Sequence, residues 1–125
     1  MLDPNMEVMI VDDAPTMRRI VRSLLRELGL KNVREAENGS VALEELKLKK
    51  ADLALVDWNM PQMDGIELLR AIRQDDNLKN MPVLMITAES KKENVLTAVQ
   101  AGVNNYIVKP FNAKTLEEKL NKIFK

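Results

Sequence analysis

Four apolar runs in this sequence predict buried strands, and each is followed at once by a residue that can take part in chemistry. The runs are 7–11, 53–56, 82–86 and 106–108, and the residues that follow them are Asp12, Asp57, Thr87 and Lys109. The runs are continuous rather than alternating, which is typical of strands covered on both faces. The chain must therefore supply helices for both sides of a parallel sheet.

The segments between the runs carry apolar residues at helical spacing. Residues spaced by three and four from Met17 to Leu28 predict a helix that begins near Pro15 and stops at Gly29. A short strand is expected over 32–36 and a helix over 40–49. Capping patterns indicate three further helix starts, at Asp64 with Glu67, at Ser90 with Glu93, and at Asn112.

Five strands, each followed by a helix, predict a single doubly wound, flavodoxin-like α/β fold with a five-stranded parallel sheet and helices on both faces. A length of 125 residues suits one compact domain. We therefore expect residues 1–125 to form one domain, with residues 1–5 flexible.

Composition narrows the chemistry that such a domain can perform. Lys and Arg number 19, as do Asp and Glu, so no net positive field attracts nucleic acid or anionic lipid. The absence of Cys and His excludes disulfides, thiolate nucleophiles, zinc–thiolate sites and histidine bases. Neither a signal peptide nor a membrane-spanning run is evident, which favours a soluble cytoplasmic protein.

The residues after the strands should meet at one edge of the sheet, where ligands bind to open parallel sheets. Asp12, Asp13 and Asp57 would bring three negative charges together there, and such charges repel. A set of oxygen ligands suits Mg²⁺, and its two charges with that of Lys109 would balance the three acids. One acid could then act as a nucleophile in phosphoryl transfer.

Each of these residues also has an ordinary structural explanation. The pair Asp12–Asp13 could cap the next helix, Thr87 could be a turn residue, and Lys109 could be a solvated charge. Trp58 and Tyr106 could serve packing alone. The Lys109–Pro110 bond can be cis or trans, because proline makes the two isomers close in energy.

Four long motifs give the chain a specific family resemblance. VDDAPTMRRIVRSLLRELG, DWNMPQMDG, PVLMITAESKKENV and NNYIVKPFNAKTLEEKLNKIF together span roughly residues 6–124. The chain resembles the receiver domains of two-component response regulators, in particular their chemotaxis members. This resemblance implies the strand order 2-1-3-4-5. Ala14–Pro15 departs from the bulkier residue and serine often found there, which leaves the detail of the first loop open.

The resemblance also implies a role for each residue at the strand ends. Asp57 would be the phospho-acceptor, and Mg²⁺ would be bound by Asp13, by Asp57 and by the main-chain carbonyl of Asn59. Asp12 would hold the metal through water.

Thr87 and Lys109 would contact the phosphoryl oxygens, and Tyr106 would turn inward as part of the switch. Asn59 and Glu89 would tune the rate of dephosphorylation.

The partners implied by the resemblance are those of bacterial chemotaxis. A histidine kinase, or a small acyl phosphate, would donate the phosphoryl group, and a dedicated phosphatase could remove it. The surface around the fourth helix, fifth strand and fifth helix would then bind a flagellar motor switch protein to control rotation. The protein would be a monomeric switch rather than an enzyme, with self phosphotransfer and autodephosphorylation only, and no output domain is expected.

Several other functions stay open from the sequence. A receiver of this kind could instead be a phosphate sink or serve a process other than motility. A haloacid-dehalogenase-like phosphatase also uses an aspartate nucleophile and Mg²⁺, but in an Asp-x-Asp pattern after its first strand. A flavodoxin-like electron carrier would need a phosphate-binding loop that is not evident here. A binding module that has lost phosphorylation is the fourth alternative.

Overall fold

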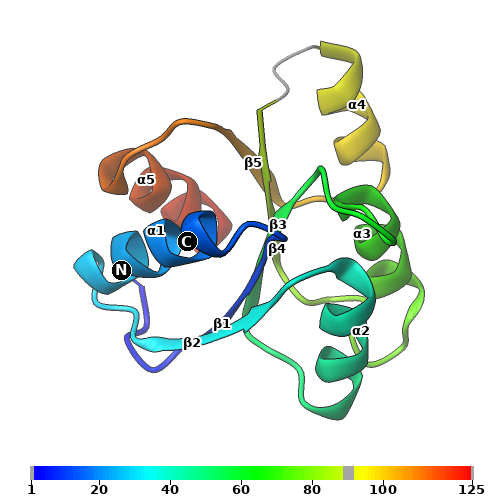
Figure 1. Cartoon of the computed structure of the whole chain (residues 1–125), viewed down its shortest axis with the longest axis horizontal. Helices are drawn as coiled ribbons and strands as arrows, with labels where there is room; N and C mark the ends of the chain where they lie inside the picture. The colour runs from blue at the N-terminus through cyan, green and yellow to red at the C-terminus, as the bar shows by residue number, and fades with distance from the viewer. Residues whose placement is uncertain (1, 89–91, 125) are drawn as a thin grey trace.

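The computed structural model describes residues 2–88 and 92–124, and it places five strands in one parallel sheet. The strand order is β2-β1-β3-β4-β5, as expected. Figure 1 views the molecule down its shortest axis, with the sheet nearly edge-on between the helices. The strands are β1 (Glu7–Val11), β2 (Asn32–Ala36), β3 (Leu53–Asp57), β4 (Val83–Thr87) and β5 (Asn105–Val108).

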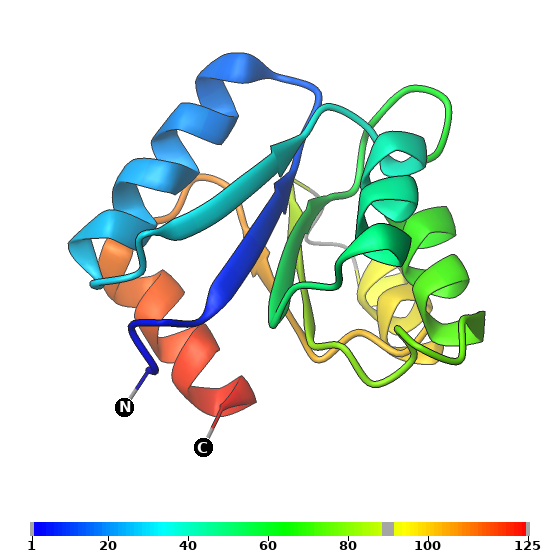
Figure 2. The same ribbon diagram turned by 90° about the horizontal axis from the view of Figure 1, so that it is seen from below.

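The helices lie in two layers, one on each face of the sheet. α1 and α5 cover one face, and α2, α3 and α4 lie on the other (Figure 1). The two chain ends lie on the same side of the molecule, near the end of α5 (Figure 2). The helices are α1 (Pro15–Glu27), α2 (Gly39–Leu48), α3 (Gly65–Gln74), α4 (Lys92–Gln100) and α5 (Ala113–Ile123). None of them is long and apolar enough to cross a membrane.

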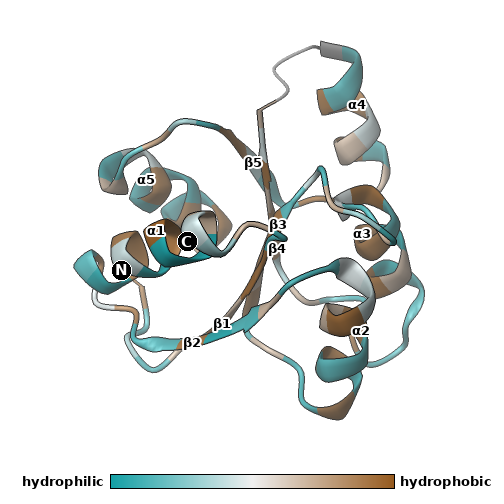
Figure 3. Cartoon of the chain, in the orientation of Figure 1, coloured by the Kyte–Doolittle hydropathy of each residue, from teal (hydrophilic) through white to brown (hydrophobic). Residues whose placement is uncertain are grey.

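Successive strand residues point to opposite faces, and both faces are buried. Val8 and Ile10 of β1 pack with the α1 and α5 side chains, whereas Met9 and Val11 pack with those of α2 and α3. The brown of the central strands in Figure 3 follows from this arrangement, whereas β2 at the edge of the sheet is largely hydrophilic and only Ala36 of it is buried. Each fully buried Leu or Ile side chain contributes about 1.5–3 kcal/mol to folding, so the sheet is a rigid platform for whatever lies at its edge.

Polar caps fix where most helices begin. The expected capping box at α3 is present: Asp64 Oδ1 accepts from the Glu67 amide at 2.9 Å, and Glu67 Oε1 accepts from the Asp64 amide at 3.1 Å. Asn112 caps α5 as expected, and Asn38 caps α2, which the sequence analysis missed. The expected capping box at Ser90 lies outside the described residues. The strands expected over 7–11 and 32–36 match those of the structure, and the other helix and strand ends differ from expectation by at most one residue.

α4 is the most lightly packed helix in the part of the chain that the structure describes. Among the described side chains of α4 only Ala98 is buried, whereas Leu96 and Val99 are exposed. The chain after α4 is held more firmly, because Arg73 of α3 donates to the carbonyl of Gly102 at 2.8 Å and to Asn104 Oδ1 at 2.8 Å. The Lys109–Pro110 peptide bond after β5 is cis.

Gly65 is the point where the first turn of α3 presses against the end of β3. A Cβ atom at residue 65 would lie 2.5 Å from the carbonyl oxygen of Asp57 and 2.9 Å from the Cα of Trp58. The Gly65 amide also donates to the Trp58 carbonyl at 2.9 Å. Only glycine allows this contact without moving the backbone that carries Asp57.

We predict that Gly65→Ala lowers the free energy of unfolding by about 1–3 kcal/mol, the usual cost of overpacking. Helix propensity alone would give the opposite sign, because Ala is favoured over Gly by about 1 kcal/mol. Urea unfolding measures the difference, with Ser23→Ala on the exposed face of α1 as the control. A Gly65→Ala protein as stable as the parent, or more stable, would show that the close contact is not limiting.

Candidate functional site

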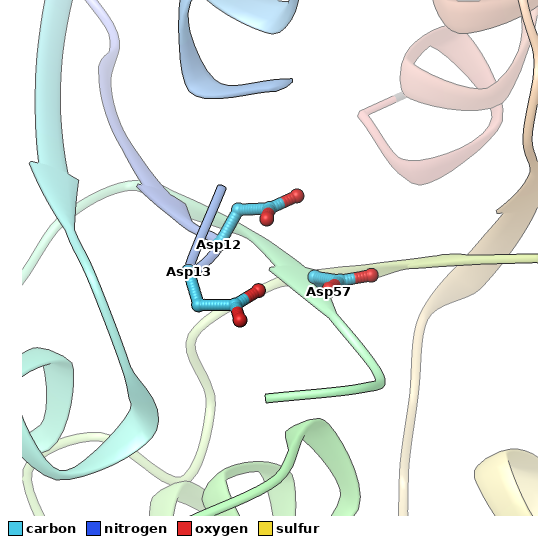
Figure 4. A group of neighbouring side chains, drawn as sticks. All are labelled: Asp12, Asp13 and Asp57. Carbon is cyan, nitrogen blue, oxygen red and sulfur yellow. The ribbon is translucent and has the colours of Figure 1, made fainter. Parts of the chain in front are cut away.

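Three carboxylates come together at the carboxyl edge of the sheet. Asp12 and Asp13 directly follow β1, and Asp57 ends the neighbouring strand β3. Each offers one oxygen atom, and these atoms all lie within 4.8 Å of one another. Figure 4 shows the three side chains gathered where the two strands end. The expected acid cluster is therefore formed, with Asp13 exposed and the other two acids buried.

Asp57 is a buried acid with one cationic partner. Lys109 Nζ donates to Asp57 Oδ1 at 3.0 Å, and it lies 3.7 Å from Asp12 Oδ2. Burial raises the pKa of Asp57, the charges of Asp12 and Asp13 raise it further, and Lys109 opposes the rise without cancelling it. One lysine therefore does not neutralise the cluster.

Asp12 shows where additional positive charge would fit. Its Oδ1 accepts from the Ala14 amide at 2.9 Å, but its Oδ2 is buried and accepts no hydrogen bond from the described residues. Lys109 Nζ lies 3.7 Å from this oxygen but donates to Asp57, so the cost of burying the Asp12 oxygen is only partly offset. Carboxylate oxygens are the ligands that Mg²⁺ prefers, so the donor set fits this ion.

The other expected site residues lie around the acids at different depths. Thr87 is buried at the end of β4, and its carbonyl accepts from the Lys109 amide at 2.8 Å. Asn59 is exposed on the loop after β3. Tyr106 is partly buried on β5 and lies opposite Met85 of β4, with Lys119 Nζ 5.3 Å from its ring centre. Glu89 lies outside the described residues.

Glycine contacts hold the loop between β3 and α3, and the sequence analysis did not identify them. Gly39 starts α2, and a Cβ atom there would lie 2.6 Å from the Met63 carbonyl oxygen. Gln62 in the same loop has a positive φ of 68°. The loop that carries Asn59 is thus packed against α2 as well as α3. The signal in the sequence was a glycine at the first position of both helices, directly after the caps Asn38 and Asp64, because glycine is a poor helix former.

An arginine pair beside the site was also missed. Arg18 Nη1 donates to the Asp12 carbonyl at 2.7 Å, and Arg18 Nε donates to Glu35 Oε1 at 3.0 Å. Arg22 Nε donates to Glu35 Oε2 at 2.8 Å. Burial raises the pKa of Glu35, but the hydrogen bonds from Arg22 and Arg18 outweigh it and hold the pKa below its usual value. No local pattern links residues 18 and 35, so this contact could not be predicted from the sequence.

Comparison with known proteins identifies the family. Residues 8–121 match the model of the response regulator receiver domain. Over 98% of its length the chain is 59% identical to the chemotaxis protein CheY-3 of Vibrio cholerae, covering 95% of that protein. It is 55% identical to the chemotaxis protein CheY of Pseudomonas aeruginosa, with 95% of this chain and 96% of that protein covered.

One solved structure with the same fold is described with a bound metal ion. The receiver domain of a sensor histidine kinase from Pseudomonas aeruginosa, described with a magnesium ion coordinated in its active site cleft, is 28% identical. Its TM-score is 0.86, with 97% of this chain and 99% of that chain covered.

These matches rule against the haloacid-dehalogenase-like phosphatase and the flavodoxin-like electron carrier, which belong to other families. The chain belongs to the response regulator receiver domain family and, within it, closely resembles the chemotaxis CheY proteins.

Proposed function

We propose that this receiver domain is a chemotaxis switch that accepts a phosphoryl group on Asp57 from a histidine kinase and then binds a flagellar motor switch protein. The observation that carries the proposal is the buried Asp57 carboxylate beside two further acids, with Lys109 Nζ at 3.0 Å. Burial of the Asp57 carboxylate beside two other acids lowers the stability of the fold. Acids kept in such an unfavourable setting are typical of functional sites, which supports a role as phospho-acceptor.

The proposed metal site uses the acids and one carbonyl group. Asp13, Asp57 and the main-chain carbonyl of Asn59 would bind Mg²⁺ directly, and Asp12 would hold it through water. A bound Mg²⁺ supplies positive charge that keeps Asp57 ionised and offsets the charge on the phosphoryl oxygens.

The transfer itself needs an ionised carboxylate in the right place. One Asp57 oxygen forms a bond to phosphorus as the bond from phosphorus to the kinase histidine nitrogen breaks, and that nitrogen keeps the electron pair. Lys109 offers its ammonium protons to a phosphoryl oxygen, and the Thr87 hydroxyl donates to another. Water later hydrolyses the acyl phosphate. Asn59 and Glu89 control how readily that water reaches the phosphorus atom.

The output follows from contacts that exist only after phosphorylation. An acyl phosphate on Asp57 adds charge and acceptor oxygens, which draw Thr87 and Lys109 inward. Tyr106 moves into the space that Thr87 leaves, and the surface of α4, β5 and α5 changes with it. A bias of a few kcal/mol between two states is enough for such a switch.

The proposed partners are the kinase, the motor switch protein and a dedicated phosphatase, and the proposed setting is a monomer in the cytoplasm. Exposed Leu96 and Val99 on α4 support a docking surface there, because large apolar side chains in contact with water favour burial by a partner. The alternative is that the protein serves as a phosphate sink. Binding experiments with the motor switch protein distinguish this role from motor control.

Trp58 follows the acceptor directly and is partly buried, so its fluorescence should report the state of the site. We expect emission to change on addition of Mg²⁺ and again on addition of acetyl phosphate or beryllofluoride. In Asp57→Asn the second change should be absent, because no carboxylate remains to form the acyl phosphate. Intact mass after acetyl phosphate provides an independent reading, and a parent protein with neither response would instead be a binding module.

We predict that Asp57→Asn is more stable than the parent at neutral pH without Mg²⁺. The ordinary carboxyl pKa is 3.8, and folding raises it. Between the two values the folded chain holds a proton that the unfolded chain has lost, so stability falls as pH rises through this window. Above it the full penalty remains, and the asparagine removes that penalty.

Thermal unfolding from pH 4 to 8 measures this difference, which should shrink as the pH falls. Saturating Mg²⁺ should raise the parent's Tm at neutral pH more than that of Asp57→Asn, because binding to the folded state alone stabilises it. An Asp57→Asn protein less stable than the parent at every pH would contradict the raised pKa.

Two matched leucine variants test the docking surface. Leu96 on α4 and Leu48 on α2 are both exposed, and only Leu96 lies on the proposed surface. Leu96→Ser should weaken binding of a beryllofluoride-treated protein to the motor switch protein by about tenfold, since burial of a leucine is worth about 1.5–3 kcal/mol. Leu48→Ser should leave it unchanged. Calorimetry measures both, and equal affinities for the two variants would place the docking surface elsewhere.

A further inference from the structure

The loop that carries Asp12 and Asp13 is fixed from several directions. The Asp12 amide donates to the Ala36 carbonyl of β2 at 3.1 Å, and Asp12 Oδ1 accepts from the Ala14 amide. The third contact comes from a side chain, because Arg18 Nη1 donates to the Asp12 carbonyl at 2.7 Å. Asp12 is therefore hydrogen-bonded both to strand β2 and to helix α1.

The start of α1 depends on this arginine more than a helix start usually does. The residue before the helix is Ala14, which makes no side-chain cap, and the first turn contains no acidic residue. Pro15 stands at the first helical position and donates no amide hydrogen. The hydrogen bond from Arg18 to the Asp12 carbonyl thus ties the first turn of the helix to the end of β1.

Arg18 is itself held in place by an acid on the edge strand. Glu35 of β2 accepts from Arg18 through one oxygen and from Arg22 through the other. The Arg18 side chain is 18% exposed and that of Glu35 is 30% exposed, so these ion pairs are partly shielded from water. A guanidinium group already held by Glu35 loses little further freedom when it also donates to the Asp12 carbonyl.

The acids need such a restraint because they repel one another. Asp13 is exposed and sits on the loop beside the buried Asp12 and Asp57. Without a cation, the loop would relieve the repulsion by moving Asp13 outward. A fixed Asp12 carbonyl opposes this movement, so the carboxylates stay within reach of a metal before it binds.

We infer that Arg18 is a positioning residue for the metal site, which holds the Asp12–Asp13 backbone in its metal-binding arrangement through its hydrogen bond to the Asp12 carbonyl. The inference rests on the proposed function, because the arrangement matters only if the acids bind Mg²⁺. Glu35 serves to orient Arg18, and Arg22 shares Glu35 without touching Asp12.

Mg²⁺ titrations followed by Trp58 fluorescence test this role in Arg18→Met, Arg18→Lys and Arg22→Met. Loss of a group that orients metal ligands typically weakens binding 10- to 100-fold, and we expect about a tenfold higher Kd for Arg18→Met. Arg18→Lys keeps the charge but not the fork, and it should recover only part of the affinity. Arg22→Met should bind within about twofold of the parent.

Arg22→Met is the matched control because it removes the same charge and also breaks an ion pair to Glu35. Removal of a nearby positive charge by itself would strengthen Mg²⁺ binding, which is opposite to the effect expected of Arg18→Met. Equal losses of affinity in Arg18→Met and Arg22→Met, or no loss in Arg18→Met, would overturn the inference.

Hydrogen exchange in the absence of Mg²⁺ gives a second reading that does not depend on metal binding. The Ala14 amide, which donates to Asp12 Oδ1, should exchange faster in Arg18→Met and Arg18→Lys but not in Arg22→Met. Unchanged exchange in both Arg18 variants would show that the arginine does not hold the loop. If the parent itself fails to bind Mg²⁺, the proposed function is wrong, and the exchange experiment still decides whether Arg18 restrains the loop.

Discussion

Repulsion among Asp12, Asp13 and Asp57 is the interaction on which the rest of this structure depends. The parallel sheet brings the acids together, since β1 and β3 are neighbours and both end at the same edge. The apolar strands around them strengthen the repulsion, because charges interact more strongly where water is excluded. Lys109 offsets only part of it. The fold therefore holds a local electrostatic cost in the place where a cation can relieve it.

The acids stay close together only if the backbone that carries them is held rigidly. The end of β3 is enclosed by the first turn of α3 at Gly65, and the next loop is packed against α2 at Gly39. The end of β1 is fixed through hydrogen bonds to Ala36 and from Arg18. Two of these contacts, Gly39 with Met63 and Asp12 with Ala36, join elements distant in the sequence, so the geometry of the site depends on tertiary packing as well as on local turns. This dependence distinguishes a prearranged site from one assembled by its ligand.

The sequence predicts what is local and repeated in this protein. Continuous apolar runs gave the strands, and the residue after each run gave the acids, Thr87 and Lys109, because parallel strands end at a common edge. Contacts between residues distant in the sequence could not be predicted from it. Nothing near Arg18 indicates Glu35 as its partner, and the tight approach at Gly65 depends on how α3 meets β3. The Asn38 cap was detectable in principle, since asparagine before a helix is a common start signal.

The hydrogen bonds of Arg73 hold the chain after α4 more firmly than α4 itself is held. This arginine also donates to the Met81 carbonyl at 2.6 Å, so it joins the loop before β4 to the loop before β5. The chain at Gly102 and Asn104 is thereby fastened to α3, whereas α4 itself buries only Ala98 among its described side chains. Regions with few buried contacts open at the lowest free energy. α4 can therefore shift or open at a lower free-energy cost than the chain that follows it, while β5 stays paired with β4 in the sheet.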